Sequence, residues 1–176
     1  MYSGVVDKTK PKHPYNGIWK TEKVTKKSCI HIAKERLEDG MKDPLVFGSD
    51  KMMAKTLAKY SGKDVWLLPE NHKEKGMVNP DAFFEGATLE MKHVRGDRRK
   101  VGLNACRALH QSENVFLYVE KEIPIDVCLR TISGTLKNIK EQALKNGNEF
   151  IGPNSNGKLL IFTNGMLYNY IWDDVL

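Results

Sequence analysis

The sequence predicts an α/β protein in which a mixed β-sheet is flanked by helices in a three-layer arrangement. Short apolar runs, which are typical of buried strands, alternate with longer segments whose apolar residues recur at helical spacing. Two pairs of such runs are joined by Glu85-Gly86 and by Asn164-Gly165, which favour tight hairpin turns. The resulting order of helices, strand, hairpin, helix, strand, helix and hairpin favours a sheet with helices on both faces.

The first part of the chain is predicted to be an arm followed by two helices and a short strand. Proline and glycine interrupt the polar N-terminal residues, so we expect a loop there, anchored by Trp19. Gly40 should end the first helix, and Asp50 (or its neighbour Ser49) should cap the second, which Gly62 ends. The expected elements are a loop over 1–24, helices over 25–39 and from 49 or 50 to 62, a strand over 64–68, and a loop over 71–79.

The second part is predicted to contain two hairpins, two helices and one strand between them. Pro124 suits the start of a long amphipathic helix, which Gly147 should end. The expected elements are strands over 81–84 and 88–94, a helix over 98–111, a strand over 114–119, a helix over 124–147, and strands over 158–162 and 166–172.

Composition indicates an ordinary globular chain with a modest preference for anionic partners. The 176 residues are 40% hydrophobic and 28% charged, enough for one core, and the net charge is +6. The three cysteines are odd in number and widely spaced, which indicates neither a disulfide framework nor a zinc site. No apolar run has membrane-spanning length and no signal-peptide core is present, so we expect a soluble protein without a membrane partner.

The candidate site is the first hairpin. Because side chains two apart on a strand share a face, Glu90 and Lys92 should lie side by side, and a turn at Gly86 can bring Asp81 back to them. Two converging carboxylates can hold a hard divalent cation, and a nearby lysine can orient an attacking water or neutralise charge on a phosphate. Glu70, directly after an apolar strand, is a possible third acidic member. The alternative is that these are ordinary solvated residues.

A run of basic residues follows this hairpin. His93, Arg95, Arg98, Arg99 and Lys100 fall within eight residues. Such a run is commonly a solvated face, but directly after a metal site it would suit a clamp on a nucleic-acid backbone.

Asp81 followed by Glu90-Met91-Lys92 resembles the core motif of PD-(D/E)XK nucleases. A wider series of motifs is similar to the C-terminal tRNase toxin domains of CdiA-type contact-dependent growth-inhibition proteins. This resemblance covers roughly residues 48–172, so we assign 46–176 to a nuclease-like domain and 1–45 to an N-terminal arm and helix of unknown role. The motifs of the series are Ala54 to Ala58, Leu67 to Glu70, Pro80 to Ala82, Glu90 to Lys92, and Ala108 to Gln111.

The resemblance implies a set of roles. Asp81 and Glu90 would hold a divalent metal, Mg²⁺ or Mn²⁺ with Zn²⁺ not excluded, and the Met91 carbonyl would be a third ligand. Lys92 would position the nucleophilic water, while Glu70 and Gln111 would have secondary roles. The implied substrate is tRNA, and the implied partner is a cognate immunity protein. The domain would act in the cytoplasm of a target cell, delivered as the C-terminal part of a larger secreted toxin.

Three alternatives stay open. A DNA endonuclease of the same fold would share the catalytic residues. In a non-catalytic nucleic-acid-binding or immunity-like module the carboxylates would be surface residues only, and Asp81→Ala would leave every activity of the protein intact. A metal-independent ribonuclease would use a histidine as acid or base, with His93 or His110 as candidates, although His93 should face away from Lys92 on its strand.

Overall fold

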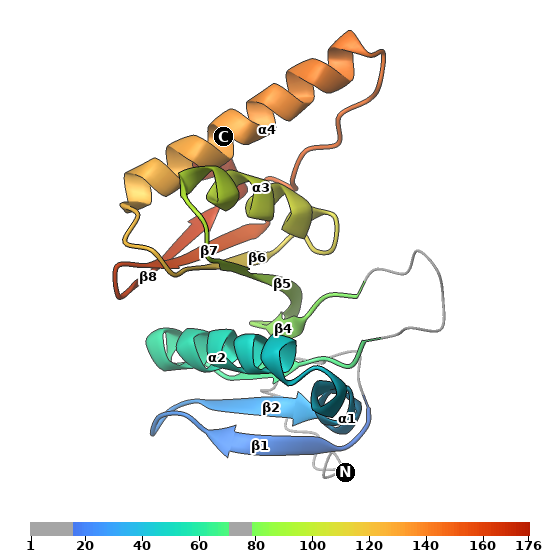
Figure 1. Cartoon of the computed structure of the whole chain (residues 1–176), viewed down its shortest axis with the longest axis vertical. Helices are drawn as coiled ribbons and strands as arrows, with labels where there is room; N and C mark the ends of the chain where they lie inside the picture. The colour runs from blue at the N-terminus through green and yellow to red at the C-terminus, as the bar shows by residue number, and fades with distance from the viewer. Residues whose placement is uncertain (1–15, 71–78) are drawn as a thin grey trace. The chain divides into compact units, whose positions relative to one another are not determined.

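The computed structural model describes residues 16–70 and 79–176 (Figure 1). In these ranges eight strands form a mixed sheet in the order β1 to β8, accompanied by four α-helices. The predicted α/β class is therefore confirmed. The chain divides into two compact units, Met1–Met91 and Lys92–Leu176, with the boundary inside strand β5 (Ala87–Val94). No helix in the described ranges is long and apolar enough to cross a membrane.

The first unit is a small sheet with two helices. Its pairs are β1–β2 antiparallel, β2–β3 parallel, and β3–β4 and β4–β5 antiparallel. Helix α2 packs on β2 and β3 (Figure 1). The elements are β1 (Trp19–Lys23), β2 (Cys29–Ala33), α1 (Lys34–Lys42), α2 (Pro44–Ser61), β3 (Val65–Leu67), β4 (Ala82–Phe84) and the first residues of β5. Residues 71–78 of the predicted loop and most of the N-terminal arm lie outside the described residues.

The helix predicted over 25–39 is wrong in its first part, because strand β2 occupies residues 29–33 and the helix begins only at Lys34. Ile30 and Ile32 are buried while the alternating residues Cys29 and His31 are only half-buried, which is the two-residue alternation of a strand. β1 lies in the predicted arm. It is the first strand in the sheet order, and Lys20 and Lys23 on it are exposed.

The prediction that Gly40 ends a helix is wrong, because Gly40 lies inside α1. A Cβ atom on Gly40 would lie 2.5 Å from the Phe47 ring of α2, so glycine lets the two helices approach closely. Helix α2 begins earlier than predicted, since the Asp43 carboxylate accepts a hydrogen bond from the Val46 amide at 3.3 Å and Pro44 occupies the first turn. Its end at Gly62, with φ of 70°, is as predicted.

The second unit packs two helices on a sheet. β6 pairs in parallel with β7, which pairs antiparallel with β8 around Asn164 and Gly165. Alternate residues of β6 and β7, including Leu117 and Ile161, join Ile132 of α4 in one apolar core. The elements are the last residues of β5, α3 (Arg98–Leu109), β6 (Val115–Val119), α4 (Ile125–Lys145), β7 (Lys158–Thr163), β8 (Met166–Ile171) and a short 3₁₀ turn, Trp172–Asp174. These elements match the predicted order closely.

Candidate functional site

The hairpin of β4 and β5 forms as predicted. Glu85 and Gly86 take positive φ values of 48° and 84°, which close a tight turn. The pairing of Ala82 with Leu89 sets the register, and one step further along this register places Asp81 opposite Glu90. The sequence pattern therefore located one candidate carboxylate, Glu90, on β5 and another, Asp81, directly before β4.

Asp81 ties the hairpin to the end of β3. Its Oδ2 atom accepts a hydrogen bond from the Met91 amide at 2.9 Å, which fixes the carboxylate against β5. Its backbone carbonyl accepts a hydrogen bond from the Leu68 amide at 3.0 Å. Glu70, two residues beyond Leu68, is thereby brought to the same region of the first unit.

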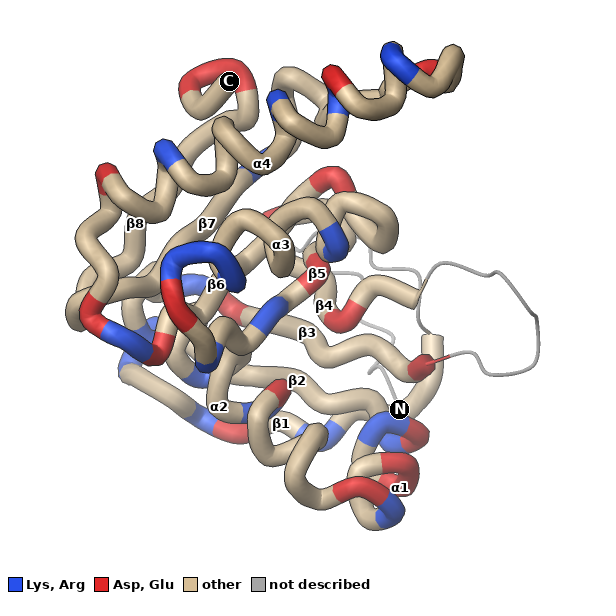
Figure 2. The backbone as a smooth tube through the Cα atoms, turned by 45° about the horizontal axis from the view of Figure 1, so that its top comes forward, with Lys and Arg blue, Asp and Glu red and all other residues tan. Residues whose placement is uncertain are grey.

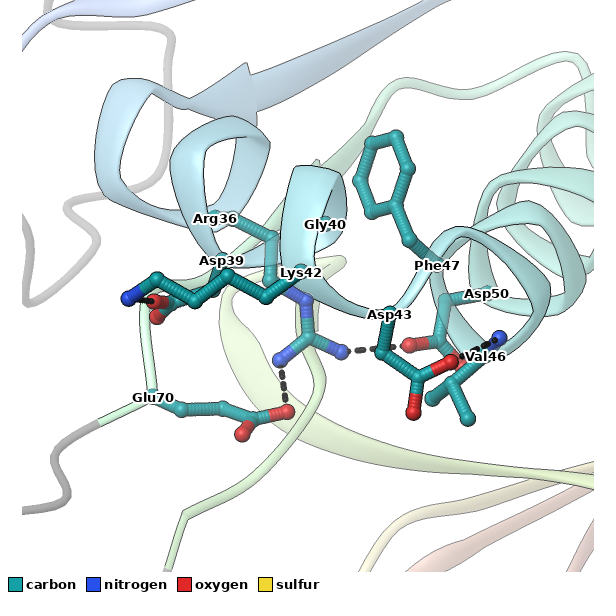
Figure 3. A pocket seen from close by; sticks show the side chains of 9 residues that line it. All are labelled: Arg36, Asp39, Gly40, Lys42, Asp43, Val46, Phe47, Asp50 and Glu70. Carbon is teal, nitrogen blue, oxygen red and sulfur yellow. Dashed lines mark hydrogen bonds and ion pairs between the residues drawn. The ribbon is translucent and has the colours of Figure 1, made fainter.

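The centre of this region is a residue that the sequence did not indicate, Arg36 on α1. The guanidinium bonds Asp50 at 2.6 Å, forms a close ion pair with Glu70, and lies 3.6 Å from Oδ1 of Asp81. Figure 3 shows it pointing between the side chains of Glu70 and Asp50. These four residues, Arg36, Asp50, Glu70 and Asp81, are called the Arg36 cluster below. Arg36, Asp50 and Glu70 also line a hollow of about 320 Å³.

The charges of the Arg36 cluster shift the pKa values of Arg36 and Asp50. Arg36 is only 3% exposed, and although burial opposes its charge, the three carboxylates raise the pKa of the guanidinium. Burial raises the pKa of Asp50 from 3.8 to about 6 against the attraction of Arg36, and the nearby charges of Asp81 and Glu70 act in the same direction. Asp50 is therefore protonated more easily than an ordinary aspartate.

Glu90 and Lys92 occupy alternate positions of β5. Glu90 is 3% exposed, so it is not the solvated strand residue that the alternative interpretation assumed. Val94, two residues beyond Lys92, faces the apolar core of the second unit, while His93 points to the other face of the strand, as predicted. Lys92 is half-buried and is the first residue of the second unit.

The donors suit a hard cation by their chemistry but are not assembled as a metal centre. Among the described residues, no three His, Cys, Asp or Glu side chains are grouped so that they could hold a metal ion. Mg²⁺ needs only one or two carboxylates because it keeps several waters, and Asp81, directly before β4, and Glu90, on β5, are the two candidates. The carboxylate of Asp81, however, already faces Arg36 and the Met91 amide.

The predicted nucleic-acid clamp divides into two parts. Arg98, Arg99 and Lys100 are exposed and open α3, where the Asp97 carboxylate caps the helix by accepting a hydrogen bond from the Arg99 amide at 3.0 Å. They form the continuous blue segment at the start of α3 in Figure 2. Arg95 is directed elsewhere, because its Nε lies 3.3 Å from Nδ1 of His93.

The histidine candidates differ from each other. His93 Nε2 lies 2.7 Å from the Glu120 carboxylate, and its ring meets the edge of Tyr118 with centroids 5.2 Å apart. His110 is exposed at the end of α3 and Gln111 lies in the following turn, so that helix ends before the predicted residue 111.

A second histidine network was missed by the sequence reasoning. His31 of β2 stacks on Trp66, while Thr21 Oγ1 lies 2.8 Å from its Nδ1 and Asp64 Oδ2 lies 2.9 Å from its Nε2. Thr21 faces His31 in the β1–β2 register, so the contact follows from strand pairing.

Comparison of this chain with protein-family models, with curated proteins and with solved structures found no match.

Proposed function

We propose that this chain is a metal-dependent endoribonuclease that cleaves tRNA by hydrolysing a phosphodiester bond, on a three-layer scaffold like that of PD-(D/E)XK nucleases. The observation that supports this proposal is the β4–β5 hairpin, whose register places Asp81 opposite Glu90 and whose Asp81 carboxylate bonds the Met91 amide. Glu90 lies on β5 and Asp81 directly before β4, where its hydrogen bond with the Met91 amide holds it against β5. Side chains held in this way are better positioned than side chains on a loop.

The residues have distinct proposed roles. Asp81 and Glu90 hold Mg²⁺ or Mn²⁺ together with the Met91 carbonyl, and Glu70 adjusts the charge beside them. A metal bound there would act as a Lewis acid on the phosphate and lower the pKa of a bound water. Lys92 orients the attacking water and neutralises charge that develops on the phosphate. Burial of Glu90 supports a role within the protein rather than at its surface.

Substrate binding is proposed for the basic start of α3. Arg98, Arg99 and Lys100 are exposed, and no ion pair to a carboxylate is found for them among the described residues. Exposed cations of this kind bind phosphates without regard to base sequence. The same surface would receive an acidic immunity protein. Delivery into the cytoplasm of a target cell, as the C-terminal part of a larger secreted toxin, belongs to the same proposal.

The test is cleavage by the purified chain of total tRNA and, separately, of plasmid DNA. Each reaction is run with Mg²⁺ or Mn²⁺ and with EDTA. We expect discrete tRNA fragments with 5′-phosphates, lost with EDTA and reduced about 100-fold or more in Asp81→Ala and Lys92→Ala. Glu141→Ala and Lys140→Ala, which remove the same two kinds of charge from the exposed face of α4, are the controls. Plasmid cleavage with intact tRNA would move the function to DNA.

A second candidate is a metal-independent ribonuclease centred on His93. The supporting observation is the 2.7 Å contact of His93 with Glu120, which can orient the imidazole, together with Arg95 beside the ring. Cleavage that survives EDTA and Asp81→Ala, is lost in His93→Ala, and leaves cyclic phosphate ends would favour this candidate. Retention of full activity in His93→Ala would exclude it.

A further inference from the structure

The second unit has a pocket of about 430 Å³ beside α4, called the α4 pocket below. Its volume falls in the range of sites that bind small molecules. The pocket lies between α4, the loop that follows this helix and the C-terminal end, which lies beside α4 in both Figure 1 and Figure 2. The lining residues are Ser133, Leu136, Lys137 and Lys140 of α4, Phe150, Gly152 and Pro153 of the loop, and Leu176.

Part of the lining is apolar and continues into the core of the second unit. Leu136 is 5% exposed and belongs to that core, and Phe150 packs against it. The loop closes tightly on the Phe150 ring, since a Cβ atom on Gly152 would lie 3.1 Å from it. Leu176, by contrast, is 60% exposed. A hydrocarbon group in the pocket would therefore remove further apolar surface from water.

The charge of the lining comes from two lysines. Lys137 and Lys140 are exposed and lie three residues apart on α4, so their side chains are neighbours on the helix surface. The ion pair on α4 joins Arg130 to Asp126, and among the described residues Lys137 and Lys140 have no such carboxylate partner. An anionic group placed between the two lysines would be stabilised by both.

The polar groups of the lining limit the class of ligand. Among the described residues that line the pocket, Ser133 is the one uncharged side chain with a hydrogen-bonding group. A nucleobase or a sugar would bring several polar atoms against apolar side chains without partners, which is costly. A hydrocarbon body has no polar atoms to satisfy. The lining therefore fits an anion with a hydrocarbon body better than it fits a nucleotide or a carbohydrate.

We propose that the α4 pocket binds a small amphiphilic acid, a carboxylate with an aliphatic body such as a medium-chain fatty acid. The carboxylate lies between Lys137 and Lys140, and the aliphatic chain lies on Leu136 and Phe150. This inference goes beyond the proposed nuclease activity and does not depend on it, because no lining residue belongs to the candidate site.

The experiment is an isothermal calorimetric titration of the full chain with decanoate, below the concentration at which decanoate forms micelles. We expect one decanoate per chain. Lys137→Gln and Lys140→Gln should each weaken binding about threefold to tenfold, since each removes a charged partner from a solvent-accessible site. Lys145→Gln is the matched control, because Lys145 is an exposed lysine of the same helix outside the lining.

A second pair of variants tests where the aliphatic chain lies. Ser133→Leu places a larger side chain in the pocket and should weaken decanoate binding about tenfold or more. Ser155→Leu makes the same change at an exposed residue outside the lining and should bind decanoate as the wild-type chain does. Circular dichroism establishes that each variant is folded. If Ser133→Leu does not fold, the lysine variants decide the test, since both lysines are exposed.

The outcomes either support or overturn the inference. Saturable binding of one decanoate that the pocket variants weaken and the two controls leave unchanged supports it. Absence of saturable decanoate binding by the wild-type chain overturns it, and so does binding that the lysine variants or folded Ser133→Leu leave unchanged. Adenosine monophosphate is titrated in parallel. If it binds as tightly as decanoate and with the same dependence on the lysines, the proposed ligand class is wrong.

Discussion

Asp50 makes the stability of the first unit depend on pH in a predictable direction. Its pKa is raised from 3.8 to about 6 in the folded chain, so the folded state binds the Asp50 proton more tightly than the unfolded state does. The resulting stabilisation is fully present below pH 3.8 and is lost as the pH rises through about 6. Asparagine has no proton to lose, so Asp50→Asn removes this dependence.

The magnitude follows from the difference between the two pKa values. About two pH units correspond to about 3 kcal/mol over the whole interval, of which about 2 kcal/mol falls between about pH 4.5 and about pH 7.5. The free energy of unfolding of Asp50→Asn relative to the wild-type chain should therefore rise by about 2 kcal/mol across that range. Loss of the ion pair with Arg36 changes the free energy of unfolding of Asp50→Asn by a constant amount. The prediction concerns only how the difference from the wild-type chain changes with pH.

Urea denaturation followed by tryptophan fluorescence at several pH values measures this difference. Asp39→Asn is the control, because Asp39 lines the same hollow but pairs with the exposed Lys42. Parallel pH profiles for Asp50→Asn and the wild-type chain would refute the reasoning, and so would a relative stability that falls as the pH rises.

Two other expectations concern helix packing and substrate binding. Gly40→Ala should destabilise the chain by about 1–3 kcal/mol, since its Cβ would overlap the Phe47 ring, whereas Gly48→Ala, with nothing within 4 Å of its Cβ, should stabilise it by up to about 1 kcal/mol. Thermal denaturation of both variants tests this, and equal effects would contradict it. Arg98→Glu should weaken tRNA binding and lower its salt dependence, while Lys140→Glu on α4 should have a smaller effect. Filter binding at several salt concentrations measures both, and identical losses would argue against a basic site at α3.

The hairpin was predictable because it depends on local information. Glu85-Gly86 selects a tight turn, the turn sets the register, and the register places Asp81 opposite Glu90. The long helix α4 was predictable for a similar reason, since its apolar stripe runs without interruption between Pro124 and Gly147. In each case the residues that decide the structure are close together in the sequence.

The Arg36 cluster was not predictable, because its members meet only through tertiary structure. Arg36 lies 14 residues from Asp50 and 34 residues from Glu70, and a buried arginine opposes the usual preference of that side chain for water. The strand β2 was missed because Ile30, Ala33 and Leu37 also match a helical spacing. In the structure Ile30 and Ala33 lie in β2, whereas Leu37 lies in the helix α1 that follows.

The exposed lysines of β1 have a consequence for how copies of this chain meet. The edge of a sheet invites another strand to add to it, and long apolar edges lead to aggregation. β1 is short, carries Lys20 and Lys23 on its exposed positions, and has Glu22 held by Lys51 and Lys55 of α2. A second chain approaching this strand would bring its own lysines against these, so the charge on β1 favours solubility at high protein concentration.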